Sequence, residues 1–482
     1  MTVPDPVSLN LSDQLAHWAK VSPRAVWIDT GEQTVTFGDA DRMARQFQTY
    51  LTRWGWTAGE VVAIDAPPAL QAILIIALYR LGAVSCQFPG LVVRESFRCD
   101  RLISTTVTES PLATHTLFLA SHNIQLVDTM EPSESHSPLA RSDAFRLIFS
   151  SGTTGAPKAI AVTTEVMARR GRQSVETRPE GSSYFCSMDL STTAGLRSLL
   201  WCLQEGTTYL SPRDATSNLG LMKKYGVDVA TMSPAQMHAL LTAARDVDEH
   251  LGHLHSVVYA GSTLDPILAD DFSSWFGCRL LTSLGSTEAG IITVRPYDTR
   301  DTRDVGYVVA GLELEIVDDD DQPVPAGTVG RIRYRRPGDP QEYFRDPEAT
   351  AQVFRDGWCY PGDAGELTDD RRLFLRGRLD DLVNVGGLKV DPSLFDQVAS
   401  GVIGVMEAAG FSFLDSRGAL QLALAISTDL NFRESELIDS LTQAFGNRRP
   451  SVVVHVDEIP RTSSGKVRRR ELARQLELGG NV

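Results

Sequence analysis

The chain has 482 residues, of which 42% are hydrophobic and 22% charged, the composition of a folded globular protein rather than a disordered one. Its formal net charge of -15 argues against a nucleic-acid partner, because binding to phosphates needs a basic face of clustered lysines and arginines. The length exceeds what one ordinary core supports, so we expect two or more domains.

The sequence predicts a protein of the reducing cytoplasm. It opens without the cationic stretch and apolar block of a secretory signal, and its longest apolar run, at 72–79, is shorter than the ~20 residues of a membrane span. The 6 cysteines are scattered, and none stands in a C-x-x-C pair or at ligand spacing from a histidine. His250, His253 and His255 lie close together, but a turn before a strand at 256–259 explains them without a metal.

Strand-like and helical patterns alternate through the first three quarters of the chain. An apolar run at 61–65 precedes a helical pattern around 72–81, and a run at 145–149 precedes a glycine-rich loop. Further strands are predicted at 227–232 and 257–259. This alternation is typical of a largely parallel sheet covered by helices.

The pattern changes twice in the last third of the chain. From about Ala310 it consists of short strands and turns, with the acidic run at 318–321 predicted as a hairpin turn rather than a cation site. Near Gly377 it becomes a mixture of strands and helices about 100 residues long, which suits a small separate domain. The run Arg468 to Arg470 is predicted to be a solvated helix face.

The most informative segment is LIFSSGTTGAPK at 147–158, an apolar strand that runs into a loop of serine, threonine and glycine. Glycines let the backbone approach an anion, hydroxyl groups donate hydrogen bonds to it, and a lysine adds positive charge. A Walker loop is excluded, because Pro157 and Ala159 flank the lysine. The candidate phosphate ligands are Ser150, Ser151, Gly152, Thr153, Thr154, Gly155 and Lys158.

This segment is similar to the phosphate-loop signature of the adenylate-forming superfamily, which comprises acyl- and aryl-CoA synthetases, adenylation domains of peptide synthetases, and luciferases. Later stretches resemble further motifs of the superfamily, in its order. They are YAGSTL at 259–264, TSLGSTE at 282–288, a run at 343–377 with DPEAT, DGW and PGD, GRLDDLVNVGGLKVDP at 377–392, and PRTSSGK at 460–466.

The resemblance implies a multidomain α/β fold. A large N-terminal domain, at 1–379, is expected to contain parallel-rich sheets with helices and a small β-barrel-like portion. A small mobile C-terminal α+β domain, at 380–482, is expected to rotate about a hinge near Asp380. Gly386 and Gly387 would then line the channel for a thiol.

The resemblance also implies roles for single residues. Glu288 supplies a carboxylate oxygen to Mg²⁺, Thr287 donates to the α-phosphate, and Asp363, assisted by Arg378, accepts from the ribose hydroxyls. Lys466 bridges the acid and the α-phosphate as pyrophosphate leaves. The remaining candidates for nucleotide binding are Gly261, Ser262, Thr282, Ser283 and Leu284.

The implied activity is that of an AMP-forming acid–thiol ligase. ATP and a carboxylic acid give an acyl-adenylate and pyrophosphate, and a thiol then captures the acyl group and releases AMP. Mg²⁺ is the expected cofactor, and the acceptor is CoA or the phosphopantetheine of a separate carrier protein, since no carrier segment follows Lys466 in the sequence.

The sequence departs from the family pattern at positions that concern the adenine and the acid. Leu284 stands where an aromatic residue usually stacks on adenine, and Thr164 and Thr192 replace two histidines common in acyl-CoA synthetases. An acid without an α-amino group is favoured, although Asp189 could pair with a substrate ammonium. The candidate residues for the acid are Asp189, Leu190, Ser191, Thr192, Thr193, Gly195 and Gly285.

Several alternatives remain open from the residues. An amino-acid adenylating enzyme, or an amide synthetase that delivers the acyl group to an amine, would keep the adenylation step. A third alternative is a luciferase-like oxidase, although no feature of the sequence points to oxygen chemistry. A fourth is a non-catalytic nucleotide-binding protein. Retention of Glu288 and Lys466 argues against the last of these.

Overall fold

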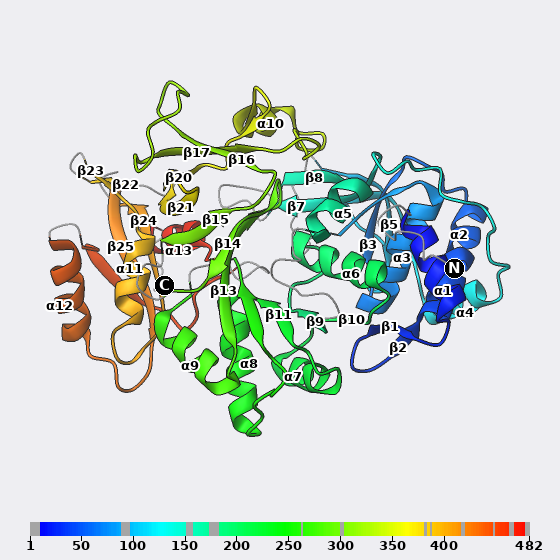
Figure 1. Ribbon diagram of the computed structural model, residues 1–482, viewed down its shortest axis with the longest axis horizontal. Helices are drawn as coiled ribbons and strands as arrows, with labels where there is room; N and C mark the ends of the chain where they lie inside the picture. The colour runs from blue at the N-terminus through cyan, green and yellow to red at the C-terminus, as the bar shows by residue number, and fades with distance from the viewer. Residues whose placement is uncertain are drawn as a thin grey trace.

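The computed structural model describes residues 10–87, 97–150, 158–172, 183–261, 264–298, 303–379, 383–385, 388–415, 420–446, 449–461 and 467–477. Two large sheets with their helices make up most of the molecule, and a smaller sheet lies towards the C-terminal end of the chain (Figure 1).

The first large sheet has the strand order β6-β5-β3-β4-β7-β8. Its strands run parallel except for β8, which is antiparallel to β7. The strands are β3 (Val61–Asp65), β4 (Val84–Cys86), β5 (Cys99–Ser104), β6 (Ala113–Phe118), β7 (Ala144–Ser150) and β8 (Lys158–Thr163). The helices of this part of the chain are α1 (Leu11–Val21), α2 (Phe37–Arg53), α3 (Pro68–Leu81) and α4 (Ser121–Asp128).

Helix α3 is buried along almost its whole length, which explains its apolar sequence. A helix that is hydrophobic all round lies in a core rather than on a surface. Ile73, Leu74 and Ile76 are at most 1% exposed and belong to the same core as Phe47 of α2 and Ile148 of β7. This core fixes the end of β7, where the phosphate loop begins.

The second large sheet joins a parallel half to an antiparallel half. The parallel strands are β9 (Tyr184–Cys186), β11 (Val229–Met232), β12 (Ser256–Tyr259) and β13 (Arg279–Ser286). The region predicted to be barrel-like continues this sheet with antiparallel strands. These are β14 (Gly290–Pro296), β15 (Asp304–Val308), β16 (Glu313–Val317), β17 (Gly330–Arg335), β18 (Phe354–Arg355), β19 (Trp358–Cys359), β20 (Asp363–Leu367) and β21 (Arg372–Arg378).

Helices and one small sheet complete this larger part of the molecule. Helices α7, α8 and α9 pack on the parallel half, where Leu240 and Phe272 share a core with Val257 of β12. The helices are α5 (Thr164–Arg172), α6 (Thr193–Glu205), α7 (Ala215–Lys224), α8 (Pro234–Asp246), α9 (Pro266–Phe276) and α10 (Pro347–Val353). The small sheet consists of β1 (Val26–Asp29), β2 (Thr34–Thr36) and β10 (Tyr209–Leu210).

The C-terminal part has a sheet and cores of its own. Strands β24 (Val405–Leu414) and β25 (Leu420–Thr428) are antiparallel, and β26 (Val452–His455) is parallel to β25. Its other elements are β22 (Val383–Val385), β23 (Leu388–Val390), α11 (Ser393–Ser400), α12 (Glu434–Phe445) and α13 (Arg469–Glu477). One core contains Phe395 and Leu437, and a second contains Ile459 and Leu472, so this β-rich unit is a separate domain.

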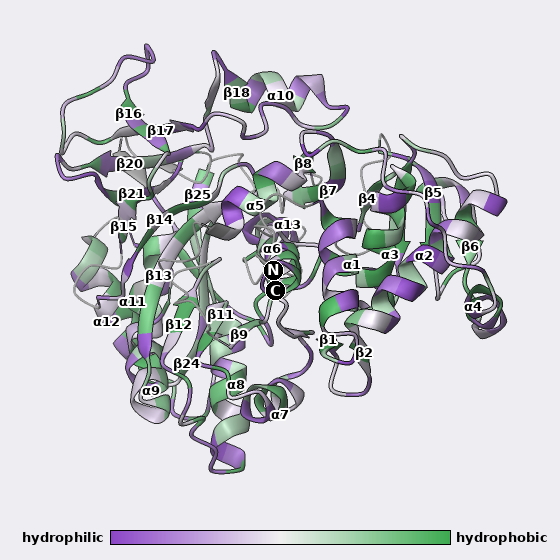
Figure 2. Ribbon diagram, turned by 45° about the vertical axis from the view of Figure 1, so that its right-hand side comes forward, coloured by the Kyte–Doolittle hydropathy of each residue, from purple (hydrophilic) through white to green (hydrophobic). Residues whose placement is uncertain are grey.

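These observations confirm the predicted multidomain α/β class, and in Figure 2 the green, apolar stretches follow strands and helices such as α3 in the interior.

The acidic run at 318–321 is a turn, in which the Asp318 amide donates to the Gln322 carbonyl at 3.0 Å. His250 stacks on Trp275, with 4.4 Å between the ring centroids. Among the described residues, no helix is long and apolar enough to cross a membrane.

The prediction of a solvated face at 468–470 is wrong for Arg469. Its guanidinium donates to the Gly410 carbonyl at 2.7 Å and pairs with Asp396 at 2.6 Å, which leaves the side chain 22% exposed. Arg468 is 54% exposed, as predicted. The difference arises because Arg469 begins α13, where the helix meets β24.

Candidate active site

The residues with the clearest site geometry lie in the turn between β13 and β14. β13 ends at Ser286 and β14 begins at Gly290, so Thr287 and Glu288 form the connection and are half-buried. The Ser286 hydroxyl accepts a hydrogen bond from the Ala289 amide at 3.0 Å and lies 2.8 Å from the Tyr334 hydroxyl. These bonds close the turn that carries the two predicted site residues.

Tyr343 connects Glu288 to Lys158. The Tyr343 hydroxyl donates to Oε1 of Glu288 at 2.8 Å, and the Lys158 ammonium lies 5.1 Å from the centre of the Tyr343 ring. Burial and the neighbouring Glu288 carboxylate raise the pKa of the Tyr343 hydroxyl, so it remains a donor at neutral pH. The structure thus brings two of the predicted catalytic residues to one tyrosine, with Lys158 over its ring and Glu288 at its hydroxyl.

Asp363 and Arg378 form the predicted pair. They stand opposite each other where β20 begins and β21 ends, with 3.5 Å between Nη1 of Arg378 and Oδ1 of Asp363. The Arg378 guanidinium also donates to the Pro361 carbonyl at 3.1 Å. Burial and, to a smaller extent, the charges of Glu288, Asp339 and Asp363 raise the pKa of the Cys359 thiol.

The adenine-side candidates lie at the carboxyl edge of the parallel strands, where ligands bind in open α/β sheets. Gly261 follows β12 with φ of +101°, a conformation that favours glycine. Thr282, Ser283 and Leu284 lie in the middle of β13, and Thr282 stands opposite Tyr259 of β12. Their position agrees with the resemblance at this segment.

The acid candidates form a second cluster at the start of α6. Thr192 caps the helix, because its hydroxyl oxygen accepts from the Gly195 amide at 3.0 Å. The Asp189 carboxylate accepts from the Ser191 amide at 2.7 Å and from the Gln87 side chain at 3.1 Å. Gly285, the remaining acid candidate, lies on β13.

Arg146 of β7 lies beneath the same cluster. It is 1% exposed and donates to the Leu190 carbonyl at 3.3 Å and to the Gln87 side chain at 3.4 Å. Burial lowers the pKa of its guanidinium to about 10, so Arg146 stays charged at neutral pH. The described contacts therefore join Asp189 and Leu190 to the first large sheet.

Part of the predicted site falls outside the described residues. For the phosphate loop, Ser150 and Lys158 stand opposite each other in β7 and β8, so its two ends are adjacent. Arg461 and Val467, which flank the predicted lysine, likewise form an antiparallel bridge. The predicted residues outside the described ranges are Ser151, Gly152, Thr153, Thr154, Gly155, Ser262, Asp380, Gly386, Gly387 and Lys466.

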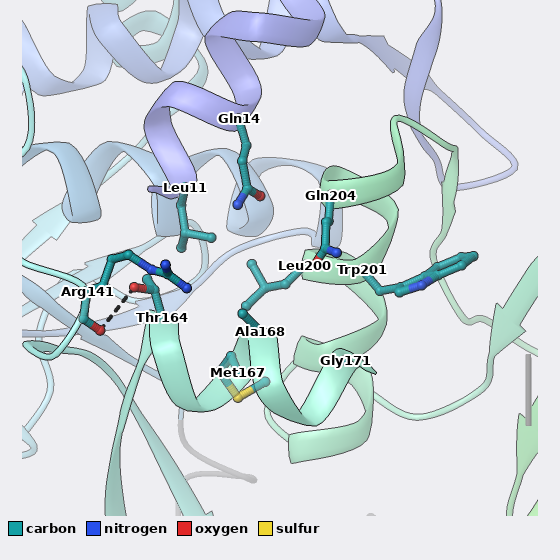
Figure 3. A pocket seen from close by; sticks show the side chains of 10 residues that line it. All are labelled: Leu11, Gln14, Arg141, Thr164, Met167, Ala168, Gly171, Leu200, Trp201 and Gln204. Atoms are coloured by element: carbon teal, nitrogen blue, oxygen red, sulfur yellow. Dashed lines mark hydrogen bonds between the residues drawn. The ribbon is translucent and has the colours of Figure 1, made fainter. Parts of the chain in front are cut away.

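A small cavity lies between α1, α5 and α6, and Figure 3 shows the side chains around it. It includes Thr164, whose hydroxyl donates to the Arg141 carbonyl at 3.2 Å, together with Leu11, Met167 and Leu200. Its volume of about 20 Å³ holds a water molecule and is far too small for a nucleotide. Thr164, which stands where acyl-CoA synthetases often have a histidine, therefore lines a small cavity between helices.

The sequence interpretation missed three residues that shape this site. Tyr343 lies inside the quoted run at 343–377, so a search for a donor near Glu288 could have found it. Arg170 donates to the carbonyls of Thr287 and Glu288, and Arg336 to those of Ala289 and Ile291. We find no sequence signal for either arginine, because both act through contacts that only the fold creates.

Comparisons with known proteins agree with this geometry. The fold matches that of O-succinylbenzoate coenzyme A synthetase from Bacillus subtilis in complex with AMP, with a TM-score of 0.83 at 19% identity over 95% of this chain and 97% of that one. It is the fold of the adenylate-forming enzymes.

The family model for AMP-binding enzymes matches residues 92–344, and the chain belongs to this family. It is 28% identical over 388 residues to a fatty acid–[acyl-carrier-protein] ligase of Mycobacterium marinum, covering 73% of this chain and 72% of that relative. It is 26% identical over 503 residues to 4-coumarate–CoA ligase 5 of Oryza sativa subsp. japonica, covering 95% of this chain and 92% of that relative.

Proposed function

We propose that the chain activates a carboxylic acid with ATP and then transfers the acyl group to a thiol, either of CoA or of a carrier-protein phosphopantetheine. The observation that carries the proposal is the arrangement around Tyr343, whose ring lies 5.1 Å from the Lys158 ammonium and whose hydroxyl binds the Glu288 carboxylate. The two curated relatives described above are named as ligases to a carrier protein and to CoA, which supports the thiol as acceptor.

In the first step, a carboxylate oxygen of the acid attacks the α-phosphorus of ATP. The bond from this phosphorus to the oxygen bridging to the β-phosphate breaks, and pyrophosphate leaves. From their positions in the motifs, Lys158 and Lys466 are assigned to balance the negative charge of the phosphates and the acid. Thr287 is assigned to donate a hydrogen bond to the α-phosphate. The protein's task in this step is alignment of two anions.

Glu288 fits a Mg²⁺ ion on the triphosphate. Carboxylate oxygens are preferred ligands of Mg²⁺. The Tyr343 hydroxyl donates to Oε1 of Glu288, whereas Oε2 accepts no hydrogen bond from the residues that the structure describes. When bound, the ion would neutralise phosphate charge. Asp363, which is 22% exposed, remains accessible to ribose hydroxyls although Arg378 is its neighbour.

In the second step, the thiol sulfur attacks the acyl carbonyl carbon and AMP leaves with its phosphate oxygen. We propose that residues 380–482 rotate about Asp380 between the two steps, withdraw Lys466 and bring Gly386 and Gly387 to the thiol channel. The independent cores of this domain support rotation as a unit. The site residues outside the described ranges are part of this proposal.

The decisive experiment is acid-dependent exchange of labelled pyrophosphate into ATP, run against aliphatic, aryl and amino acids. Exchange with AMP as the final nucleotide product is expected. Formation of ADP would contradict the proposal, and ATP binding without exchange for any acid would favour a non-catalytic protein. Product analysis with CoA, a holo-carrier protein and amines side by side then identifies the acceptor.

A further inference from the structure

Two buried arginines hold the turn that carries Thr287 and Glu288. Arg170 of α5 donates to the carbonyl of Thr287 at 3.1 Å and to that of Glu288 at 2.5 Å. Arg336, directly after β17, donates to the carbonyls of Ala289 at 3.4 Å and of Ile291 at 3.3 Å. Four carbonyl groups of one short hairpin are therefore bound by two guanidinium groups.

Both arginines are inaccessible to solvent and share a counter-ion. Arg170 is 0% and Arg336 is 5% exposed. Asp339 lies 3.9 Å from each of them and pairs more closely, at 2.5 Å, with Arg169. Within the described part of the chain, Asp339 thus pairs with Arg169 and also lies near the guanidinium groups of Arg170 and Arg336.

The turn is shaped to pack on Arg170. Gly290 has φ of +70°, and a Cβ atom there would come within 3.0 Å of Cδ of Arg170. A side chain at this position would therefore push the turn away from the guanidinium. The Glu288 side chain meanwhile reaches Tyr343, so backbone and carboxylate of the same residue are fixed by different elements.

A buried cation costs stability unless its hydrogen bonds and ion pairs offset the loss of its hydration. Hydrophobic side chains of similar size would fill the space behind the turn at lower cost. The retained charges make physical sense if they preorganise the turn for an anionic ligand, because groups fixed in advance need no reorganisation when charge arrives.

We propose that Arg170 and Arg336 are positioning residues of the nucleotide site, which hold the turn at 286–291 by its carbonyl groups and so present Thr287 and Glu288 to Mg²⁺-bound ATP. This inference rests on the proposed function, since it assigns the metal-bound triphosphate to Glu288. Neither arginine touches the nucleotide; each acts through the turn.

The test compares Arg336→Met with Arg335→Met in the full chain. Arg335 is the neighbouring residue, but its side chain is 44% exposed and pairs with Glu313, away from the turn. For Arg336→Met, the Mg²⁺ concentration for half-maximal pyrophosphate exchange should rise by roughly tenfold, the lower end of the effect of residues that orient metal ligands. Acyl transfer from a presynthesised adenylate should change little, and Arg335→Met should keep the wild-type Mg²⁺ dependence.

Arg170→Lys supplies a second variant, because lysine keeps the charge but cannot donate to two carbonyls with a planar group. A raised Mg²⁺ requirement in Arg170→Lys, with the charge retained, would support positioning by geometry. Folded Arg336→Met and Arg170→Lys proteins with the wild-type Mg²⁺ requirement would overturn the inference. If Arg336→Met fails to fold, Arg170→Lys decides alone.

Calorimetry separates this inference from the proposed function. Binding of ATP with and without Mg²⁺ is measured on the wild type and on both variants, with no acid present. If the wild type shows no pyrophosphate exchange with any of the acids tested, the proposed function fails. Weaker Mg²⁺-dependent ATP binding in the variants would still support the positioning role. Equal binding in all three proteins would refute it.

Discussion

Among single residues, Tyr343 contacts two predicted catalytic residues, Lys158 and Glu288. Its ring lies beneath the Lys158 ammonium and its hydroxyl holds one oxygen of Glu288. A phenol can do this without competing for the metal, because it donates one proton and leaves the second carboxylate oxygen open. The residue therefore couples the end of the phosphate loop to the metal candidate.

Tyr343→Phe should slow pyrophosphate exchange by roughly tenfold, since a hydrogen bond to a charged group contributes about 1.5–3 kcal/mol and only part of it is realised in the transition state. The ring and its contact with Lys158 are kept, so the fold should be unaffected. The measurement is exchange at several Mg²⁺ concentrations. Tyr360→Phe is the control, because the Tyr360 hydroxyl accepts from Arg333 and not from the site. Equal rates in both variants would contradict the role of Tyr343.

At the scale of elements, the β13–β14 hairpin depends on glycine at one position for two separate reasons. Gly290 has positive φ and lies against Arg170. Gly311 has a similar φ of +75° but nothing within 4 Å of the place its Cβ would occupy. The two positions therefore separate backbone strain from contact with the arginine.

Gly290→Ala should lower the free energy of unfolding by more than Gly311→Ala, which should cost about 1–2 kcal/mol from the left-handed backbone alone. The additional loss at Gly290 comes from displacement of the turn, and it should be accompanied by a fall in pyrophosphate exchange. Urea unfolding and exchange on both variants make the comparison. Identical losses of stability, with exchange unchanged, would show that the turn tolerates displacement.

The junction of α13 with β24 gives a second prediction at this scale. Arg469→Met removes the bonds to Asp396 and the Gly410 carbonyl, and should cost about 1–3 kcal/mol because the carboxylate is left without its partner. Arg468→Met should have almost no effect, since Arg468 forms an exposed pair with Glu471. Thermal unfolding of the two variants tests this. A loss of similar size in both would mean that Arg469 behaves as a surface residue after all.

At the scale of the whole molecule, motifs and periodicity were sufficient for the fold class. The strand before the phosphate loop, the alternation at 61–81 and the change of pattern near Gly377 all correspond to observed elements. The pair of Asp363 and Arg378 also follows from the sequence motifs. Short-range patterns identify elements reliably where local sequence and fold agree.

Long-range contacts could not be predicted in this way. Arg170 binds a carbonyl 118 residues away, and Tyr343 a carboxylate 55 residues away. No periodicity records such pairs, because each depends on how segments far apart in the sequence come together in the fold. The same reason applies to Arg469, which looks like one of three surface arginines until α13 is placed on β24.

The last prediction concerns the proposed rotation of the C-terminal domain, which would move Lys466. In the proposed division of the chain at Asp380, Lys466 falls in the small domain and Glu288 and Asp363 in the large one. A rotation would then bring the lysine to the nucleotide for only one of the two steps. Lys466→Ala should reduce adenylate formation by orders of magnitude and leave thiol capture of a presynthesised adenylate largely intact. The two half-reactions are measured separately, by pyrophosphate exchange and by thioester formation. Equal losses in both would mean that the lysine serves a single conformation throughout, and the rotation would have to be abandoned.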